Sequence, residues 1–251
     1  MIRRDRSTTP YDAAWYSRHL EGMTRSAKIV LGLLYGIYRP QSVIDIGCGR
    51  GAWLAAAESL GSTRLKGLDG NWVRKEELLT RNMEFLAVNL DESMPRIGER
   101  FDLCLALEVA EHIPETSARP FIATLCSASD IVLFSAAIKF QGGKDHRNEQ
   151  WQSYWVELFK EQGYECYDIF RAALWNNEDV EWWYRQNMFL YVGPQNTLVS
   201  VEALRGSQRP VIDVAHPVNY ANKARAMEHP TLRSCLGCLK RYIRNALGRV
   251  P

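Results

Sequence analysis

The 251-residue sequence predicts an α/β fold, in which a mainly parallel β-sheet carries helices on both faces. Three observations predict it. Short apolar, β-branched segments alternate with segments of helical spacing between residues 11 and 192. The segment 130–135 is apolar almost throughout, as expected for a strand that is covered on both faces. Closely spaced glycines follow the first predicted strand directly, where α/β sheets bind ligands.

The elements follow one another in a regular order. A helix is expected over residues 11–38, because apolar side chains recur there at helical spacing and stop before Pro40. After Gly193 the periodicity fades, so residues 194–230 are expected to be extended coil with several prolines. Strands are expected at 42–46, 65–69, 84–89, 101–107, 130–135, 165–171 and 188–192, with a helix at 151–162.

Composition narrows the class of protein. The net charge of +2 gives no general reason to expect nucleic-acid binding. No apolar segment follows the charged start and no run approaches 18 apolar residues, so neither a secretory signal nor a membrane span is expected. The six cysteines are scattered, and a single Cys235-x-x-Cys238 pair cannot close a zinc site, so free thiols in a reducing cytoplasm are expected.

The most informative segment is 43–51, which reads Val-Ile-Asp-Ile-Gly-Cys-Gly-Arg-Gly. A dinucleotide site would have its third glycine one position later, where Ala52 stands, so a dehydrogenase is a distant alternative. The string resembles motif I of class I S-adenosylmethionine-dependent methyltransferases. This resemblance implies the Rossmann-like sheet of that class, with seven strands, mostly parallel, and an antiparallel last strand. The predicted domains are 1–193, which includes the N-terminal helix, and a C-terminal extension, 194–251.

Several residues are expected to bind S-adenosylmethionine. Asp69 lies 22 positions after Gly47, at the end of the second strand, where a carboxylate can accept hydrogen bonds from both ribose hydroxyls. Asn89 is expected to accept from the adenine amino group, with Asp91 as the competing candidate. Asp45 is expected to orient the glycine turn through backbone N–H groups. The predicted cofactor set is Asp45, Gly47, Cys48, Gly49, Gly51, Asp69, Gly70, Asn89, Leu90 and Glu108.

Two segments are expected to carry the chemistry. Residues 107–114 resemble the segment after the fourth strand of many class I methyltransferases. Within it, Glu108 is expected to position the methionine ammonium or an acceptor hydroxyl, and His112 is expected to be structural. His146 lies in a polar, glycine-containing loop after the fifth strand, and imidazole is suited to accept a proton from an attacking hydroxyl. The alternative is an exposed loop histidine without a role.

The acceptor site is expected between this loop and the aromatic segment 175–187. The residues from His146 to Phe159 resemble a bacterial and viral methyltransferase subfamily that is often associated with glycan or surface-polysaccharide genes. Arg185 is expected to position the acceptor, and one of Trp182 and Trp183 to be buried while the other faces the pocket. The predicted acceptor-binding residues are Asn148, Gln150 and Trp183. No metal is expected, because the sequence shows no carboxylate and histidine set with ligand spacing.

Residues 233–249 hold five basic and no acidic residues, with leucines and an isoleucine at helical spacing. They are expected to form a basic amphipathic helix. One hypothesis is contact with anionic lipid at the inner face of the membrane, and the other is a packed helix or frayed tail.

Taken together, these motifs predict a cytoplasmic methyltransferase that acts on oxygen of a saccharide or related small metabolite. An N-methyltransferase, or an inactive cofactor-binding scaffold that recruits glycan-assembly enzymes, is the alternative.

Overall fold

The computed structural model describes residues 13–197, 199, 200, 204 and 212–247. The chain divides into two compact units, Met1–Val214 and Ala215–Pro251. The predicted domain boundary at 193/194 stays a prediction. The later division follows hydrogen bonds that hold residues 212–214 in the first unit, such as those from Ser153 to the Asp213 carboxylate at 2.9 Å.

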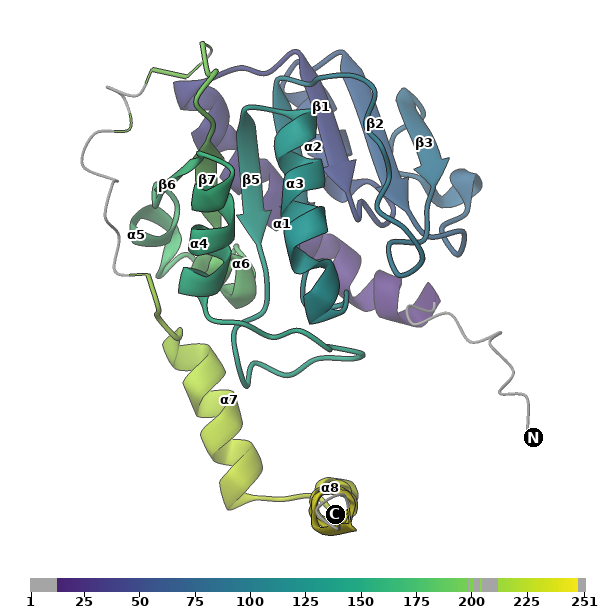
Figure 1. Ribbon diagram of the computed structural model, residues 1–251, viewed down its shortest axis with the longest axis vertical. Coiled ribbons are helices and arrows are strands. Elements are labelled where there is room, and N and C mark those ends of the chain that lie inside the picture. The colour runs from purple at the N-terminus through teal and green to yellow at the C-terminus, as the bar shows by residue number, and fades with distance from the viewer. Residues whose placement is uncertain (1–12, 198, 201–203, 205–211, 248–251) are drawn as a thin grey trace. The chain divides into compact units, whose positions relative to one another are not determined.

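The first unit is built on a seven-stranded sheet with the order β3-β2-β1-β4-β5-β7-β6 (Figure 1). Strands β1 to β5 pair with one another in parallel, whereas β7 runs antiparallel to β5 and β6. The predicted fold class is therefore confirmed. The strands are β1 Ser42–Ile46, β2 Arg64–Asp69, β3 Met83–Ala87, β4 Leu103–Leu107, β5 Ile131–Ser135, β6 Glu165–Tyr167 and β7 Phe189–Val192.

Side chains alternate between two apolar cores along the central strands. Leu103 and Leu105 of β4 belong to one core, which α1 (Ala13–Ile37) and α2 (Ala52–Ser59) cover. Cys104 and Ala106 belong to the other, which α3 (Ala118–Ala128) and α4 (Gln152–Glu161) cover. In Figure 1, α3 and α4 accordingly lie in front of the sheet and α1 behind it. Because both faces are covered, β1, β4 and β5 are buried along their whole length.

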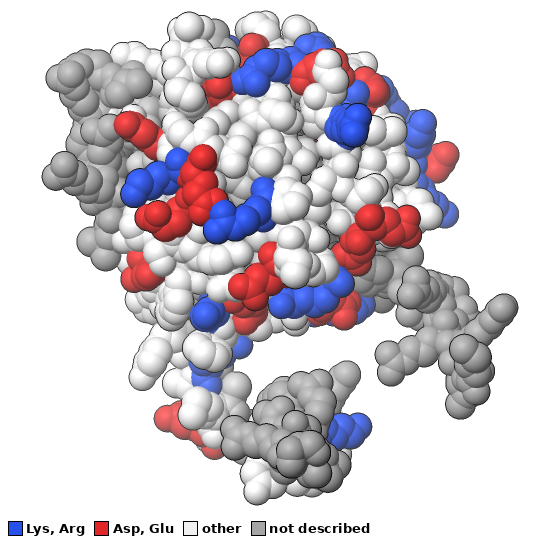
Figure 2. Space-filling view, viewed as in Figure 1, with Lys and Arg blue, Asp and Glu red and all other residues white. Residues whose placement is uncertain are grey.

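The sixth predicted strand is longer than the observed one. The strand expected at 165–171 ends at Tyr167, because the Asp168 carboxylate accepts from the Arg171 backbone N–H at 3.1 Å and from its Nε at 2.8 Å. A short helix, α5 (Arg171–Leu174), begins there, and α6 (Trp182–Asn187) follows before β7. On the face shown in Figure 2, basic and acidic side chains are interspersed.

The second unit contains α7 (Pro217–Glu228) and α8 (Leu232–Leu247). The expectation of coil throughout 194–230 was therefore wrong. His216 caps α7 by accepting from the Val218 N–H at 3.2 Å, and Pro217 occupies the first helical turn, where its missing N–H has no cost. The predicted C-terminal helix is present as α8. Among the described residues, no helix is long and apolar enough to cross a membrane.

Candidate active site

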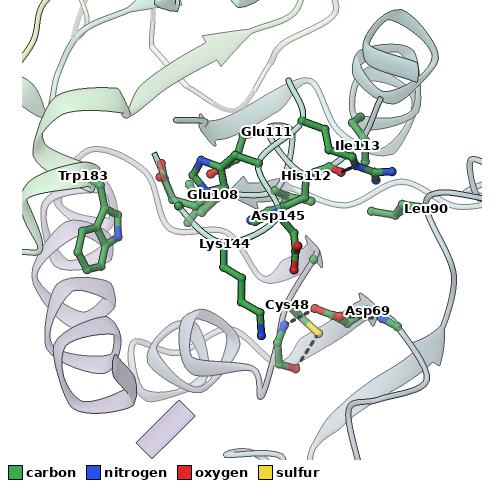
Figure 3. A pocket seen from close by; sticks show the side chains of 18 of the residues that line it. Cys48, Asp69, Leu90, Glu108, Glu111, His112, Ile113, Lys144, Asp145 and Trp183 are labelled. Carbon is green, nitrogen blue, oxygen red and sulfur yellow. Dashed lines mark hydrogen bonds between the residues drawn. The ribbon is translucent and has the colours of Figure 1, made fainter. Parts of the chain in front are cut away.

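The loops that follow strands β1 to β5 line a pocket of about 960 Å³ at the carboxyl edge of the sheet. This is the edge at which parallel sheets bind ligands. Figure 3 shows Cys48 and Asp69 on one side of the pocket and Glu108, Glu111 and His112 on the opposite side. The two sides of the pocket therefore come from different strands of the sheet.

The glycine turn after β1 presents bare backbone to the pocket. The N–H groups of Gly47 and Cys48 both donate to the Leu68 carbonyl, at 2.7 and 3.0 Å, and so fix the turn against the end of β2. Gly47 has a φ of 88°, and a Cβ there would lie 2.3 Å from Val109 Cγ2. Gly51, at φ 78°, caps α2 and does not line the pocket. Glycine is thus required at 47 by both conformation and space.

Asp69 holds this turn in place of Asp45. Its carboxylate accepts from the Gly49 N–H at 2.7 Å and from the Gly70 N–H at 2.6 Å. Asp45 was expected to orient the turn, but its Oδ2 has no hydrogen-bond partner among the described residues. It is 2% exposed and lines the pocket, and burial together with the charge of Asp69 raises its pKa well above the usual range. Asp45 therefore offers a buried acceptor atom to a ligand.

The loop after β3 brings Asn89 and Leu90 to the pocket as predicted. The Asn89 side chain is also used locally, since its Oδ1 accepts from the Asp91 N–H at 3.1 Å and its Nδ2 donates to Glu92 at 2.9 Å. Trp72 was missed by the sequence analysis. It lines the pocket, and its ring lies so close to Gly70 that a Cβ there would approach within 2.2 Å. The predicted contact of Asn89 with adenine stays a prediction.

Glu108 forms the floor of the opposite side. It adopts a left-handed backbone conformation, with a φ of 56°, and its N–H donates to the Ser135 carbonyl at 2.9 Å. Asn187 and Gln141 donate to its two carboxylate oxygens, at 3.2 and 3.4 Å, and burial raises its pKa. The sequence analysis missed Asn187 and Gln141, because neither lies near Glu108 in the chain. Together they fix the direction of this carboxylate.

The loop after β5 is fastened to the segment after β4. The backbone N–H groups of Arg147 and Asn148 donate to the Glu111 carbonyl, at 2.8 and 3.0 Å. His146 lines the pocket, and its Nδ1 lies 2.8 Å from Glu149 Oε1. Lys144 of the same loop points into the pocket in Figure 3. His146 therefore has the position predicted for it, whereas its role in proton transfer stays a prediction.

Other expected acceptor residues lie outside the pocket. Arg185 is 7% exposed and its Nη1 donates to the Trp175 carbonyl at 3.0 Å, so it does not reach the cavity. Asn148 is buried and accepts from Gln150 at 3.0 Å, and neither residue lines the pocket. Both tryptophans of α6, at 182 and 183, are half-buried and line it, so the expectation that one would be buried was wrong.

His112 was expected to be structural, and this prediction was incomplete. Its ring lies 4.9 Å from that of His146 at an angle of 84°, on the pocket wall beside Glu111. One ligand-capable atom from each of Glu111, His112 and His146 lies within 4.8 Å of the others. The spacing argument missed this group because 34 positions separate the two histidines along the chain.

Comparison with known proteins places this geometry in a fold class. No family model matches the chain. It is 34% identical over 93 residues to a ubiquinone biosynthesis O-methyltransferase of Methylobacterium sp. (strain 4-46). The aligned residues make up 35% of this chain and 36% of that protein. The chain thus matches about a third of the length of this curated relative.

Solved structures match over more of the chain. Magnesium protoporphyrin IX methyltransferase from Synechocystis PCC 6803, crystallised with bound SAH, matches with a TM-score of 0.53 and 16% identity over 74% of this chain and 90% of that one. An O-methyltransferase family protein from Burkholderia thailandensis matches with a TM-score of 0.52 and 13% identity over 72% and 57%. With the strand order and the glycine turn, these matches show that the chain has the fold of class I S-adenosylmethionine-dependent methyltransferases.

Proposed function

We propose that the chain is an S-adenosylmethionine-dependent methyltransferase that methylates an oxygen of a saccharide or a related small metabolite. One observation carries the proposal: a single cavity contains the bare glycine turn and Asp69 on one side, and Glu108 and His146 on the other. The Synechocystis structure with bound SAH supports the cofactor, and the name of the Methylobacterium relative supports an oxygen acceptor.

The first side of the pocket fits the cofactor. The turn at Gly47 lets backbone approach the methionine end, and Asp69 lies where the ribose hydroxyls can donate to its oxygens. The unpartnered Oδ2 of Asp45 fits a positively charged group such as the methionine ammonium. Trp72 adds an aromatic surface next to Gly70. The cofactor supplies a methyl group on a sulfonium, and these residues hold it in one orientation.

The second side fits the acceptor. Methyl transfer is an in-line displacement, so these residues have to orient one acceptor oxygen and let its proton leave. The direction of the Glu108 carboxylate is fixed by Asn187 and Gln141, which suits it to accept from an acceptor hydroxyl. Trp182 and Trp183 present aromatic rings to the same cavity, and such rings suit the apolar face of a sugar.

Calorimetry with S-adenosylhomocysteine tests the cofactor site. Asp69→Ala removes the ribose acceptor, so a loss of about 1.5–3 kcal/mol in binding free energy is expected for hydrogen bonds to a charged group. Glu76→Ala, which removes an exposed acid outside the pocket, is the control and should bind normally. Absence of binding by the parent chain would refute the proposal.

Transfer of a labelled methyl group to a panel of sugars, phenols and amines then separates the alternatives. Transfer to hydroxyl compounds alone supports the O-methyltransferase, and transfer to amines supports an N-methyltransferase. Tight cofactor binding without transfer to any acceptor supports the inactive scaffold.

For the second unit we propose contact with an anionic membrane surface. On α8, Leu232, Leu236 and Leu239 recur at helical spacing and are 80%, 51% and 54% exposed, and Ile243 continues the same stripe. The segment 233–249 carries five basic and no acidic residues. An exposed apolar stripe beside basic residues is typical of helices that lie in the plane of an anionic interface.

A further inference from the structure

Three side chains from two segments converge on the acceptor side of the pocket. Glu111 and His112 follow β4, and His146 lies in the loop after β5, with one ligand-capable atom of each within 4.8 Å of the others. Backbone hydrogen bonds from Arg147 and Asn148 to the Glu111 carbonyl, at 2.8 and 3.0 Å, join the two segments. The Arg147 side chain adds a bond from its Nε to the His112 carbonyl at 2.6 Å. The arrangement is therefore part of the fold and does not depend on the side chains alone.

Glu111 is fully buried, and neither of its carboxylate oxygens makes a hydrogen bond of good geometry among the described residues. The backbone of Glu111 and Ala137 and the Glu108 carboxyl are the polar groups that approach it. Glu108 is a second acid close by, partly buried in the same wall of the pocket. Among the described residues, no Lys or Arg forms an ion pair with either acid. A buried carboxylate without partners is costly, and a bound cation would compensate both acids.

The two histidines have the form that binds metals. The His112 ring lies edge-on to the His146 ring, with 4.9 Å between their centroids. His146 Nδ1 is directed at Glu149 Oε1, which leaves the lone pair of a neutral ring on Nε2. A carboxylate behind a histidine is the usual outer partner of a metal-binding imidazole. A Cβ at position 143 would lie 2.2 Å from His146 Nε2, so a larger residue at 143 would push into this nitrogen.

We infer that Glu111, His112 and His146 form a site for a divalent first-row transition cation, with Glu108 beside it. Two imidazoles and a carboxylate suit Zn²⁺, Mn²⁺, Co²⁺ or Fe²⁺ better than Ca²⁺. The inference deepens the proposed function and rests on it, since the site would take an acceptor that binds the cation through hydroxyl oxygens, such as a sugar diol.

A cation in this site changes how the acceptor loses its proton. A hydroxyl bound to a divalent cation has a lowered pKa, so its proton passes to water. The oxygen then forms a bond to the methyl carbon while the carbon–sulfur bond breaks, and that electron pair stays on sulfur as a neutral thioether. His146 would hold the cation, and so would not be the base that the sequence analysis expected.

The test is Co²⁺ binding to the full-length chain, followed by visible absorption and calorimetry after chelator treatment. Cys235→Ser with Cys238→Ser serves as the background, because these exposed thiols could bind Co²⁺ themselves. One Co²⁺ per chain is expected. Binding should be lost in His146→Ala and Glu111→Gln, and Glu149→Gln should weaken it about 10- to 100-fold. His229→Ala, at an exposed histidine of the second unit, should leave it unchanged.

S-adenosylhomocysteine binding in the same samples shows that each variant is folded. His146 lies in a loop, so His146→Ala keeps the test valid even where Glu111→Gln does not fold. Unchanged Co²⁺ binding in His146→Ala, or no Co²⁺ binding by a chain that binds S-adenosylhomocysteine, would overturn the cation site and leave the proposed function intact. Co²⁺ binding by a chain that does not bind S-adenosylhomocysteine would support the cation site and refute the proposed function.

Discussion

Asp45 gives a prediction in which stability and cofactor binding change in opposite directions. The residue is 2% exposed, and its Oδ2 has no hydrogen-bond partner in the part of the chain that the structure describes. Burial and the charge of Asp69 raise its pKa well above 3.8. Asp45→Asn keeps the shape of the side chain and removes the buried charge, and its amide can donate toward Asp69. An unsatisfied buried acceptor costs about 1–3 kcal/mol. For a chain of this length about 1 kcal/mol shifts Tm by roughly 2–4 °C, so Tm at neutral pH should rise by roughly 2–12 °C.

The raised pKa of Asp45 determines how the difference in Tm changes with pH. Because the folded chain holds the Asp45 proton more tightly than the unfolded chain does, stability from this group is fully present below about pH 3.8, the usual pKa. It is lost as pH rises from there toward the higher folded-state pKa. The difference in Tm between Asp45→Asn and the parent should therefore be small in acid and grow toward neutral pH.

Cofactor binding should change in the opposite direction. Loss of a charged acceptor for the ammonium should weaken S-adenosylhomocysteine by about 1.5–3 kcal/mol, or roughly 10- to 150-fold. Circular dichroism melts from pH 3 to 8 and calorimetry near pH 7 measure both effects. The control is Asp69→Asn, which should lower both Tm and affinity, because Asp69 accepts from two backbone N–H groups. A Tm for Asp45→Asn at or below the parent value, or a difference independent of pH, would refute the reasoning.

Three further predictions concern the loop, the turn and the tail. His146→Ala should lower turnover by about 10²–10⁴-fold, whether the histidine takes the proton or holds a cation, while S-adenosylhomocysteine affinity stays near normal; normal turnover would remove His146 from the chemistry. Gly47→Ala should abolish cofactor binding and lower the free energy of unfolding by about 1–3 kcal/mol, because the φ of Gly47 is 88° and a Cβ there would meet Val109. Melting and calorimetry measure both effects. The control is Gly98→Ala, which has open space around it and should change little. The full chain should sediment with anionic vesicles at low salt and be released as salt rises, and sedimentation that is the same with neutral vesicles would contradict lipid contact through α8.

Local patterns predicted most of the fold. The buried strands β1, β4 and β5 are short apolar runs, so their positions follow from composition, and the glycine turn after β1 follows from its own sequence. Strand 165–171 was predicted too long because apolar residues continue past Asp168, whose carboxylate accepts from the Arg171 N–H and turns the chain away from the sheet. Helix α7 was missed because its apolar residues form only a weak helical pattern and it begins at a proline.

The acceptor side was harder to predict because tertiary contacts assemble it. Asp69 ends β2, the strand that follows the glycine turn and α2 in one strand–helix–strand unit, so sequence spacing was sufficient to place it. Arg185 looked suited to bind an acceptor, but its guanidinium turns to the Trp175 carbonyl. The group of Glu111, His112 and His146 depends on β4 lying beside β5 and on the loop binding back to Glu111. No spacing rule contains that information.

The position of β1 between β2 and β4 has a consequence for how this protein could diversify. Loops on the β2 side carry the turn and Asp69, and loops on the β4 side carry Glu108 and the segment around His146. In the chain, the first group ends before residue 92 and the second begins at 107. The two groups of pocket residues therefore occupy separate stretches of the sequence, and each can change without the other. Exchange of the segment after residue 107 between related proteins should change the acceptor while the cofactor stays the same, and well-separated substitutions from the two groups should combine additively.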